Sequence, residues 1–285
     1  MTASNTNEKE LKTLPIKNGF KLMFKRSQLS IPYALFLAMF VVFPLLLIVF
    51  YAFTSKTGQF TLDNFIFFFT NRTYLSNLFV SLIIGAISTL LCLVIGYTVA
   101  YILSRMNVKK GSILLLLFIM PMWINFVLRA MAMKELMTLL GIFAKNDFYN
   151  YLNTVIGMVY DYLPFMILPL YTTLIKMDKS LEEAALDLGA SKVKVFTKVT
   201  LPLSFPGIMS GITMVFLPSM SAYVISDTFG NGKVWIIGKL IEEQFGTGAN
   251  WNAGSAIAIV MLLVMFVTML LSGGFKEETN VKGAL

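Results

Sequence analysis

The 285-residue sequence contains no histidine and only one cysteine, Cys92. The lack of histidine excludes imidazole metal ligands, histidine-based catalytic triads and histidine proton relays. A single cysteine excludes a disulfide within the chain. Charged residues are also scarce, at 13% of the chain against about 25% in soluble domains, while 57% of the residues are hydrophobic. Such a composition predicts a membrane protein without a catalytic or metal-binding cluster.

Long apolar segments make up most of the chain. A bilayer core about 30 Å thick and a helical rise of about 1.5 Å per residue require about 20 apolar residues for each span. Six segments meet this requirement: 31–53, 78–103, 112–132, 152–175, 207–226 and 251–272. We therefore predict an all-α integral membrane protein with six transmembrane helices.

The basic residues predict the orientation of these helices. If the N-terminus is cytoplasmic, the cytoplasmic segments hold sixteen of the 23 Lys and Arg residues, and the outer loops hold six. Arg129 lies within the third predicted span. Because cytoplasmic loops are enriched in Lys and Arg, both termini are expected in the cytoplasm. The predicted organisation is a tail over 1–30, a membrane domain over 31–275 and a tail over 276–285.

Small residues follow one face of the second predicted span. At helical spacing, Ser81, Gly85, Ser88, Cys92 and Gly96 lie in one stripe. Small side chains let helix backbones approach closely. This span is therefore predicted to pack against other helices.

A cytoplasmic segment between the fourth and fifth spans, residues 176–206, is longer than a helix connection needs. We call it the hook. Its first helix is predicted over 180–188, with Ser180 as N-cap and Glu183 completing a capping box. Gly189 can adopt the left-handed conformation that ends such a helix.

A second short helix is predicted from Ser191 to about Thr200, where Leu201 and Pro202 should end it. The apolar positions of the two helices are Leu181, Ala184, Ala185, Leu188, Val195, Phe196 and Val199. They have too little partner surface inside the hook, so docking into a groove of another protein is expected. The alternative is an amphipathic helix on the inner leaflet, which Glu182, Glu183 and Asp187 disfavour because anionic lipid repels them.

The hook resembles the signature loop of permease subunits of ATP-binding cassette (ABC) importers. The motif is Glu-Ala-Ala, three residues, Gly, nine residues, an aliphatic residue, one more residue and Leu-Pro. It is met by Glu183, Ala184, Ala185, Gly189, Val199, Leu201 and Pro202, with Glu182 directly before it. Val199 stands where isoleucine is usual.

This resemblance implies the type I importer permease fold, with a core region of about 76–272. It also implies that the hook couples the chain to a separate ATPase, which binds ATP and Mg²⁺, so that this chain needs no cofactor.

Within this family the chain is similar to spermidine/putrescine permeases. The similarity lies in residues 115–134, 163–192, 217–227 and 236–245, followed by Trp251. It implies ATPase subunits, a second related permease and an extracytoplasmic polyamine-binding protein as partners, in a bacterial plasma membrane. Other solutes of the family, such as ferric ion, sulfate or thiamine, remain alternatives.

Asp161 is the only acid well inside a predicted span. Acids inside a membrane are costly, by about 2.5–3.5 kcal/mol or more, and they often serve function. We predict that Asp161 faces the pathway and holds a substrate ammonium. Two alternatives are an ion pair with Arg129 and the capping of a helix broken at Pro164.

Four further residues are candidates for the pathway. Aromatic rings attract ammonium groups, which favours Tyr223 and Trp123. Asn125 would present an amide, and Asp227 a carboxylate at the outer end of the fifth span. The alternative for Trp123 is an ordinary ring facing lipid or another helix.

Other function classes find little support. No G-x-x-x-x-G-K-[ST] phosphate loop occurs, because Gly232–Lys233 lacks both the earlier glycine and the hydroxyl residue. A secondary transporter driven by an ion gradient would need paired intramembrane acids or inverted repeats, and the sequence shows neither. Nucleic acid is not an expected partner. The basic residues lie in loops between the spans, where the orientation of the helices and contact with membrane lipid explain their presence.

Overall fold

The computed structural model describes residues 26–143, 145–248 and 250–271. Its helices, with π-helical segments η1 and η3 and the 3-10 segment η2, are α1 (Arg26–Leu37), η1 (Ala38–Val42), α2 (Phe43–Ala52), α3 (Asp63–Thr70), α4 (Arg72–Arg105), α5 (Val108–Ile119), η2 (Met120–Trp123), α6 (Phe126–Leu139), α7 (Asp147–Leu174), α8 (Ser180–Asp187), α9 (Lys192–Val195), η3 (Phe196–Thr200), α10 (Leu201–Leu203), α11 (Phe205–Ser221), α12 (Tyr223–Phe229), α13 (Ile237–Phe245) and α14 (Trp251–Leu271). The described residues contain no β-strand, only an isolated bridge between Thr54 and Phe60. The all-α prediction is confirmed for this part of the chain.

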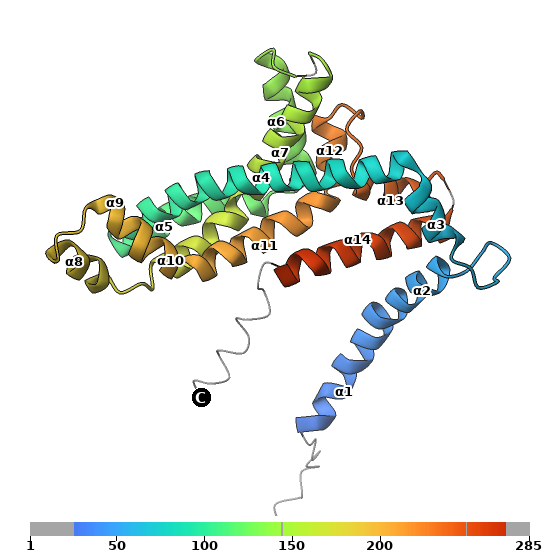
Figure 1. Cartoon of the computed structure of the whole chain (residues 1–285), viewed down its shortest axis with the longest axis horizontal. Coiled ribbons are helices and arrows are strands. Elements are labelled where there is room, and N and C mark those ends of the chain that lie inside the picture. The colour runs from blue at the N-terminus through green and yellow to red at the C-terminus, as the bar shows by residue number, and fades with distance from the viewer. Residues whose placement is uncertain (1–25, 144, 249, 272–285) are drawn as a thin grey trace, which may run out of the picture. The chain divides into compact units, whose positions relative to one another are not determined.

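The chain divides into two compact units, Met1–Leu47 and Ile48–Leu285. In the first, the described part is helical, and its large apolar side chains, such as Leu35 and Phe36, are exposed. In the second, α4 and α11 lie side by side, α8 and α9 project at one end, and α6 with the start of α7 rises from the middle of α4 (Figure 1). The predicted tails 1–30 and 276–285 lie outside the described residues, except for 26–30.

Four helices are long and apolar enough to cross a membrane: Ile31–Ala52, Arg72–Arg105, Asp147–Leu174 and Trp251–Leu270. Two bent pairs of helices could provide two more spans, Val108–Trp123 with Phe126–Leu139 and Lys192–Leu203 with Phe205–Ser221. The described residues therefore contain four to six candidate spans.

The third predicted span is not one helix, which corrects the sequence prediction. Its two parts meet at 98°. Pro121 lies in the short 3-10 turn, Ile124 is extended, and Asn125 accepts hydrogen bonds from the N–H groups that open α6. A proline cannot donate to the preceding turn, and a new N-cap starts the next helix in a new direction.

The fifth predicted span, 207–226, also ends earlier than expected. α11 stops at Ser221, and Ala222 separates it from α12 with φ −72° and ψ 59°. Pro218 lies one turn before this break. By contrast, α7 continues through Pro164 and Pro169, so the predicted capping of a helix broken at Pro164 is wrong.

The core of the second unit forms where α4, α7 and α11 meet. The small-residue stripe of α4 is buried at all five positions, which confirms the packing prediction. Gly96 lies against Met166 of α7, and Gly85 lies against Ser219 and Phe216 of α11. Close helix contact therefore depends on the absence of larger side chains along this face.

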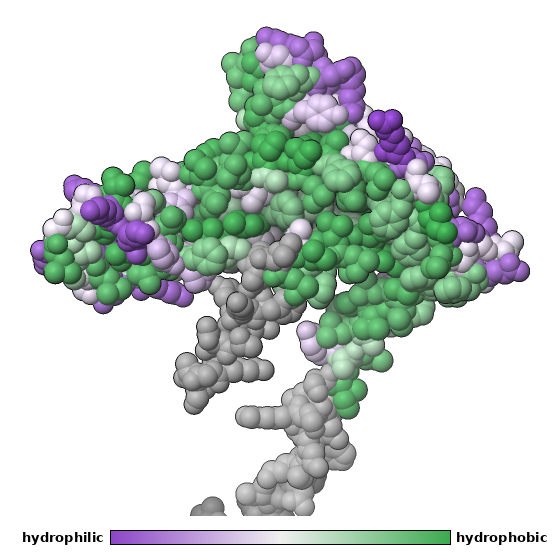
Figure 2. Space-filling model, in the orientation of Figure 1, coloured by the Kyte–Doolittle hydropathy of each residue, from purple (hydrophilic) through white to green (hydrophobic). Residues whose placement is uncertain are grey.

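The surface of the second unit is divided by polarity (Figure 2). Hydrophobic side chains cover the middle of α4 and α11, while hydrophilic ones gather over the hook and over the lobe formed by α6 and the start of α7. Residues such as Leu90 and Val94 of α4 are largely exposed. A broad exposed apolar surface of this kind is suited to lipid or to other membrane helices.

The close approach of α5 to the end of α4 yields a stability prediction. A Cβ added at Gly111 would lie 2.6 Å from the backbone oxygen of Leu103, whereas one at Gly96 would meet the flexible side chain of Met166 at 2.9 Å. Overpacking costs about 1–3 kcal/mol where nothing can yield. Gly111→Ala should therefore lower the thermal midpoint of the solubilised subunit clearly more than Gly96→Ala. Equal midpoints for the two variants would contradict this packing.

Candidate functional site

The hook begins with α8, but its cap differs from the prediction. Ser180 makes no side-chain capping bond to α8, so the predicted capping box is wrong. Instead, Asp178 accepts a 2.9 Å hydrogen bond from the backbone N–H of Ser180. Hydrogen bonds from Ser180 to the charged carboxylate hold the pKa of Asp178 below its ordinary value. The acceptor at the start of α8 therefore lies two residues earlier than the sequence suggested.

The turn between the two hook helices agrees with the prediction. Gly189 has φ +84°, the left-handed conformation that favours glycine. Ser191 then caps α9 by accepting from the N–H of Lys194 at 3.4 Å. The hook therefore turns sharply where the glycine lies.

The second hook helix does not end at Leu201 and Pro202, which corrects the prediction. It continues through the π-helical segment η3 and α10 to Leu203, and the chain bends by 63° before α11. Pro202 lies just after the π-helical segment, and the helix continues through it. The second hook helix is therefore about one turn longer than its proline indicated.

Glu182 attaches the hook to the end of α4. Its carboxylate pairs with the guanidinium of Arg105 and accepts a 2.7 Å hydrogen bond from the hydroxyl of Thr200. The side chains of Arg105 and Glu182 are 24% and 14% exposed, so this pair is partly shielded from water. The Arg105 guanidinium also lies 5.0 Å from the centre of the Tyr101 ring. We call these contacts the clasp.

Aromatic packing extends the clasp along α4. The ring of Phe196 meets both Tyr97 and Tyr101 edge-on, with centroid distances of 5.7 Å in each case. The hydroxyl of Tyr97 is 2.9 Å from that of Ser204, at the bend before α11. Sequence reasoning missed Arg105. A usable signal was the spacing of Tyr97, Tyr101 and Arg105, which follow one another every four residues at the predicted cytoplasmic end of a span.

The hook presents its other face outward. Glu183 and Ala184 are exposed, and Leu188 is 89% exposed. Of the seven predicted docking positions, Val195 is buried, Phe196 is half-buried against α4, and the other five are exposed or half-buried. These five positions are Leu181, Ala184, Ala185, Leu188 and Val199. The exposed positions among them therefore lie mainly on α8, and Val195 and Phe196 instead attach α9 and η3 to the body.

Asp161 is buried and forms an ion pair with Arg129 of α6. The Arg129 guanidinium also lies 5.6 Å from the centre of the Tyr160 ring. This geometry matches the ion-pair alternative and contradicts a carboxylate open to the pathway. The reason is tertiary: the bend after α5 turns Arg129 toward α7, where a buried cation requires a counter-charge.

The remaining pathway candidates are only partly brought together. Trp123 is 76% exposed, Asn125 caps α6, and Asp227 pairs with Lys239, whose ammonium also lies over Trp235. Tyr223 lines a cavity of about 220 Å³ at the break between α11 and α12. Two aromatic residues that the sequence analysis did not select, Phe126 and Tyr162, line it as well.

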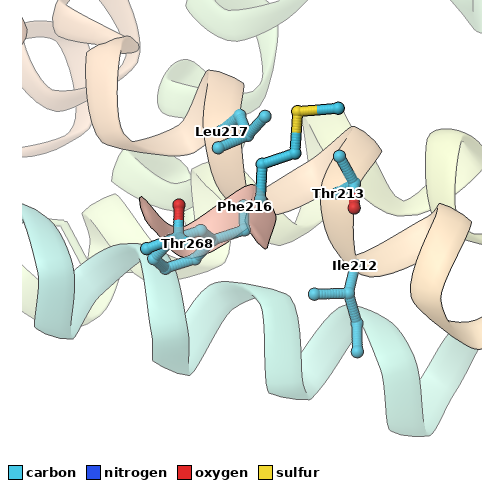
Figure 3. A pocket seen from close by; sticks show the side chains of 6 residues that line it. Ile212, Thr213, Phe216, Leu217 and Thr268 are labelled. Atoms are coloured by element: carbon cyan, nitrogen blue, oxygen red, sulfur yellow. The ribbon is translucent and has the colours of Figure 1, made fainter. Parts of the chain in front are cut away.

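A smaller apolar cavity lies between α11 and α14 (Figure 3). Its volume is about 30 Å³, far below the roughly 300–1,000 Å³ of ligand pockets. The hydroxyls of Thr213 and Thr268 in its wall both donate to carbonyls of their own helices. Figure 3 shows carbon-rich side chains such as Leu217 and Ile212 around it. This cavity is therefore too small and too apolar for a charged solute.

Within the described ranges, no three His, Cys, Asp or Glu side chains come close enough to hold a metal ion. Cys92 is fully buried in the core between α4 and α7.

The buried ion pair yields a test by double-mutant cycle. Asp161→Asn should leave the Arg129 guanidinium buried without a counter-charge, at a cost of roughly 3–5 kcal/mol. Adding Arg129→Met should recover part of the lost stability, because the charge that needs a partner is then gone. Denaturant unfolding of the solubilised subunit measures both effects. Additive losses in the double variant would contradict the pairing.

Comparison with known proteins agrees with this geometry. Residues 92–276 match the family described as "Binding-protein-dependent transport system inner membrane component". The spermidine/putrescine transport system permease protein PotB of Haemophilus influenzae is 36% identical over 253 residues, covering 81% of this chain and 88% of that protein. PotB of Escherichia coli K12 is 36% identical over 254 residues, covering 82% and 91%.

Solved structures support the same fold. A bacterial ABC transporter that imports the acidic polysaccharide alginate superposes with a TM-score of 0.67 at 15% identity, covering 88% of this chain and 94% of the other. The alginate transporter in complex with a periplasmic protein bound to an alginate pentasaccharide gives 0.71, also at 15% identity, covering 89% and 94%. This chain thus belongs to the inner membrane components of binding-protein-dependent transport systems, as a multi-pass transport permease homologous to PotB and not an enzyme.

Proposed function

We propose that this chain forms part of the translocation pathway of an ATP-driven importer for spermidine and putrescine. The observation that carries the substrate class is the 36% identity to PotB over most of both chains. The hook supports the energy source, because its outer face, with Leu188 at 89% exposure, suits a groove on another protein. Ferric ion, sulfate or thiamine import is the alternative within the family.

The importer we propose has further subunits. The partners are ATPase subunits that bind ATP and Mg²⁺, a second related permease and an extracytoplasmic polyamine-binding protein. The proposed topology has six spans and both termini in the cytoplasm, with each bent helix pair taken as one span. The hook then lies on the cytoplasmic side with the ATPase, as the distribution of Lys and Arg favours.

Coupling in this proposal runs through the clasp. The hook is covalently joined to α7 and α11, yet its charged and aromatic contacts attach it to α4. Hydrogen bonds to charged groups contribute about 1.5–3 kcal/mol each, so the pairing of Glu182 resists separation. Movement of the docked hook would therefore pull α4 along with it, and α4 in turn packs along α7 and α11.

The proposed function predicts a specific dependence on partners. Co-expressed with an ATPase, the second permease and the binding protein, this chain should support spermidine and putrescine uptake into proteoliposomes only when ATP is supplied. The chain by itself should hydrolyse no ATP. Uptake by the chain alone without ATP would revive the secondary-transporter alternative. Uptake of sulfate, thiamine or ferric ion, and not of polyamines, would reject the substrate class.

Variants of two neighbouring glutamates allow binding of the ATPase to be tested separately from transmission of the movement of the hook to α4. Glu183 points outward and Glu182 is in the clasp, so Glu183→Ala should weaken co-purification of the ATPase. Glu182→Ala should leave the complex assembled but lower the number of polyamines imported per ATP hydrolysed. Arg105→Met should have the same effect, without a further loss in the double variant. Identical behaviour of the two glutamate variants would contradict this division.

A further inference from the structure

The break between α11 and α12 interrupts the ladder of backbone hydrogen bonds; the hydroxyl of Ser221 donates to the carbonyl of Pro218, and Gly238 packs against the carbonyl of Ser221. α11 ends at Ser221, Ala222 is non-helical, and no backbone hydrogen bond within the described residues crosses Ala222 to close the last turn. The final carbonyl groups of a helix lack intrahelical partners and carry partial negative charge. The residue at the break therefore lies beside the negative end of a helix of 17 residues.

The cavity of about 220 Å³ lies at this break. Its wall combines Pro218 and residues 221–225 around the break with aromatic residues from three different helices, and no lining residue is charged. The rings are Phe126 at the start of α6, Tyr162 of α7 and Tyr223 at the start of α12. Two chain breaks, after α5 and after α11, thus meet around one cavity.

Aromatic faces and free carbonyls both attract cations. An ammonium group over a ring is stabilised by the ring quadrupole, and helix ends unwound inside membrane proteins coordinate cations through their carbonyls. The one cation nearby in the sequence, Arg129, lies one turn after Phe126 and is neutralised by Asp161. The ion pair therefore leaves the cavity without a repelling positive charge.

We propose that the cavity at the α11–α12 break is a binding subsite for one primary ammonium group of the transported solute. This inference rests on the proposed function for the identity of that solute as a polyamine. An anion is disfavoured because the wall holds no positive charge and the hydroxyl of Ser221 donates to the carbonyl of Pro218. The subsite gives Tyr223 a defined role and assigns new ones to Phe126 and Tyr162.

Removal of a ring tests the subsite with an internal control. Tyr223→Leu should lower polyamine uptake by the assembled complex about 3- to 30-fold, the range expected for a cation–π contact, while Tyr223→Phe keeps the ring and should stay near the unchanged rate. Tyr223 is 40% exposed, so the fold should tolerate either change. ATP hydrolysis by the complex shows that assembly is intact. Equal uptake by both variants would overturn the subsite.

A tethered ammonium gives a second test. Val224 lies in the cavity wall, so Val224→Lys places a competing cation at the subsite, whereas Val224→Met has a similar length without the charge. The lysine variant should lose uptake and the methionine variant should retain it. Equal uptake by the two variants would contradict an ammonium site.

Thiol labelling tests occupancy without transport. The natural thiol of Cys92 is fully buried, so Ala222→Cys provides one reactive thiol at the cavity. Spermidine should slow labelling of Ala222→Cys by a cationic methanethiosulfonate reagent in the assembled complex. A neutral solute at the same concentration, with NaCl added to match the ionic strength, should not. Unchanged labelling would overturn the subsite. If the unmodified complex imports no polyamine, the proposed function fails; if it does and these variants behave like it, only the subsite fails.

Discussion

Backbone groups that enter a bilayer must find hydrogen-bond partners within the protein, and the rest of this structure depends on that constraint. It makes the described chain helical and confines breaks to places where other groups can replace the lost bonds. Asn125 supplies such a replacement at the start of α6. At the break after α11 the hydroxyl of Ser221 donates to the carbonyl of Pro218, and a cavity lined by aromatic residues lies there.

Charged residues are scarce in this chain, and two of the ion pairs join helices that are distant in the sequence. Arg129 and Asp161 join α6 to α7 inside the membrane domain, and Arg105 and Glu182 join α4 to the hook. In surroundings of low dielectric constant, a charge without a partner is costly, so each pair favours one arrangement of its two helices. The first pair keeps the surroundings of the cavity neutral. The second links the exposed face of the hook to α4, the longest helix of the described residues.

Local sequence patterns predict the structure correctly where a single residue type decides the conformation. The positive φ of Gly189, the cap at Ser191 and the buried stripe on α4 all follow from properties of those residue types. The prolines were harder to interpret, because Pro202 and Pro164 remain inside helices while the chain bends after Pro121. A proline removes one donor and adds one steric conflict, and neighbouring groups determine whether the helix continues.

The sequence by itself determined the membrane class, the helical content, the family motif in the hook and the face on which α4 packs, because these depend on hydrophobic runs, spacing and residue type. Only the tertiary structure decided the 98° bend after α5, the partner of Asp161 and the attachment of Glu182 to Arg105. Asp161 is 32 residues from Arg129, and Glu182 is 77 residues from Arg105. Such pairings depend on how whole helices pack, which no local pattern of residues encodes.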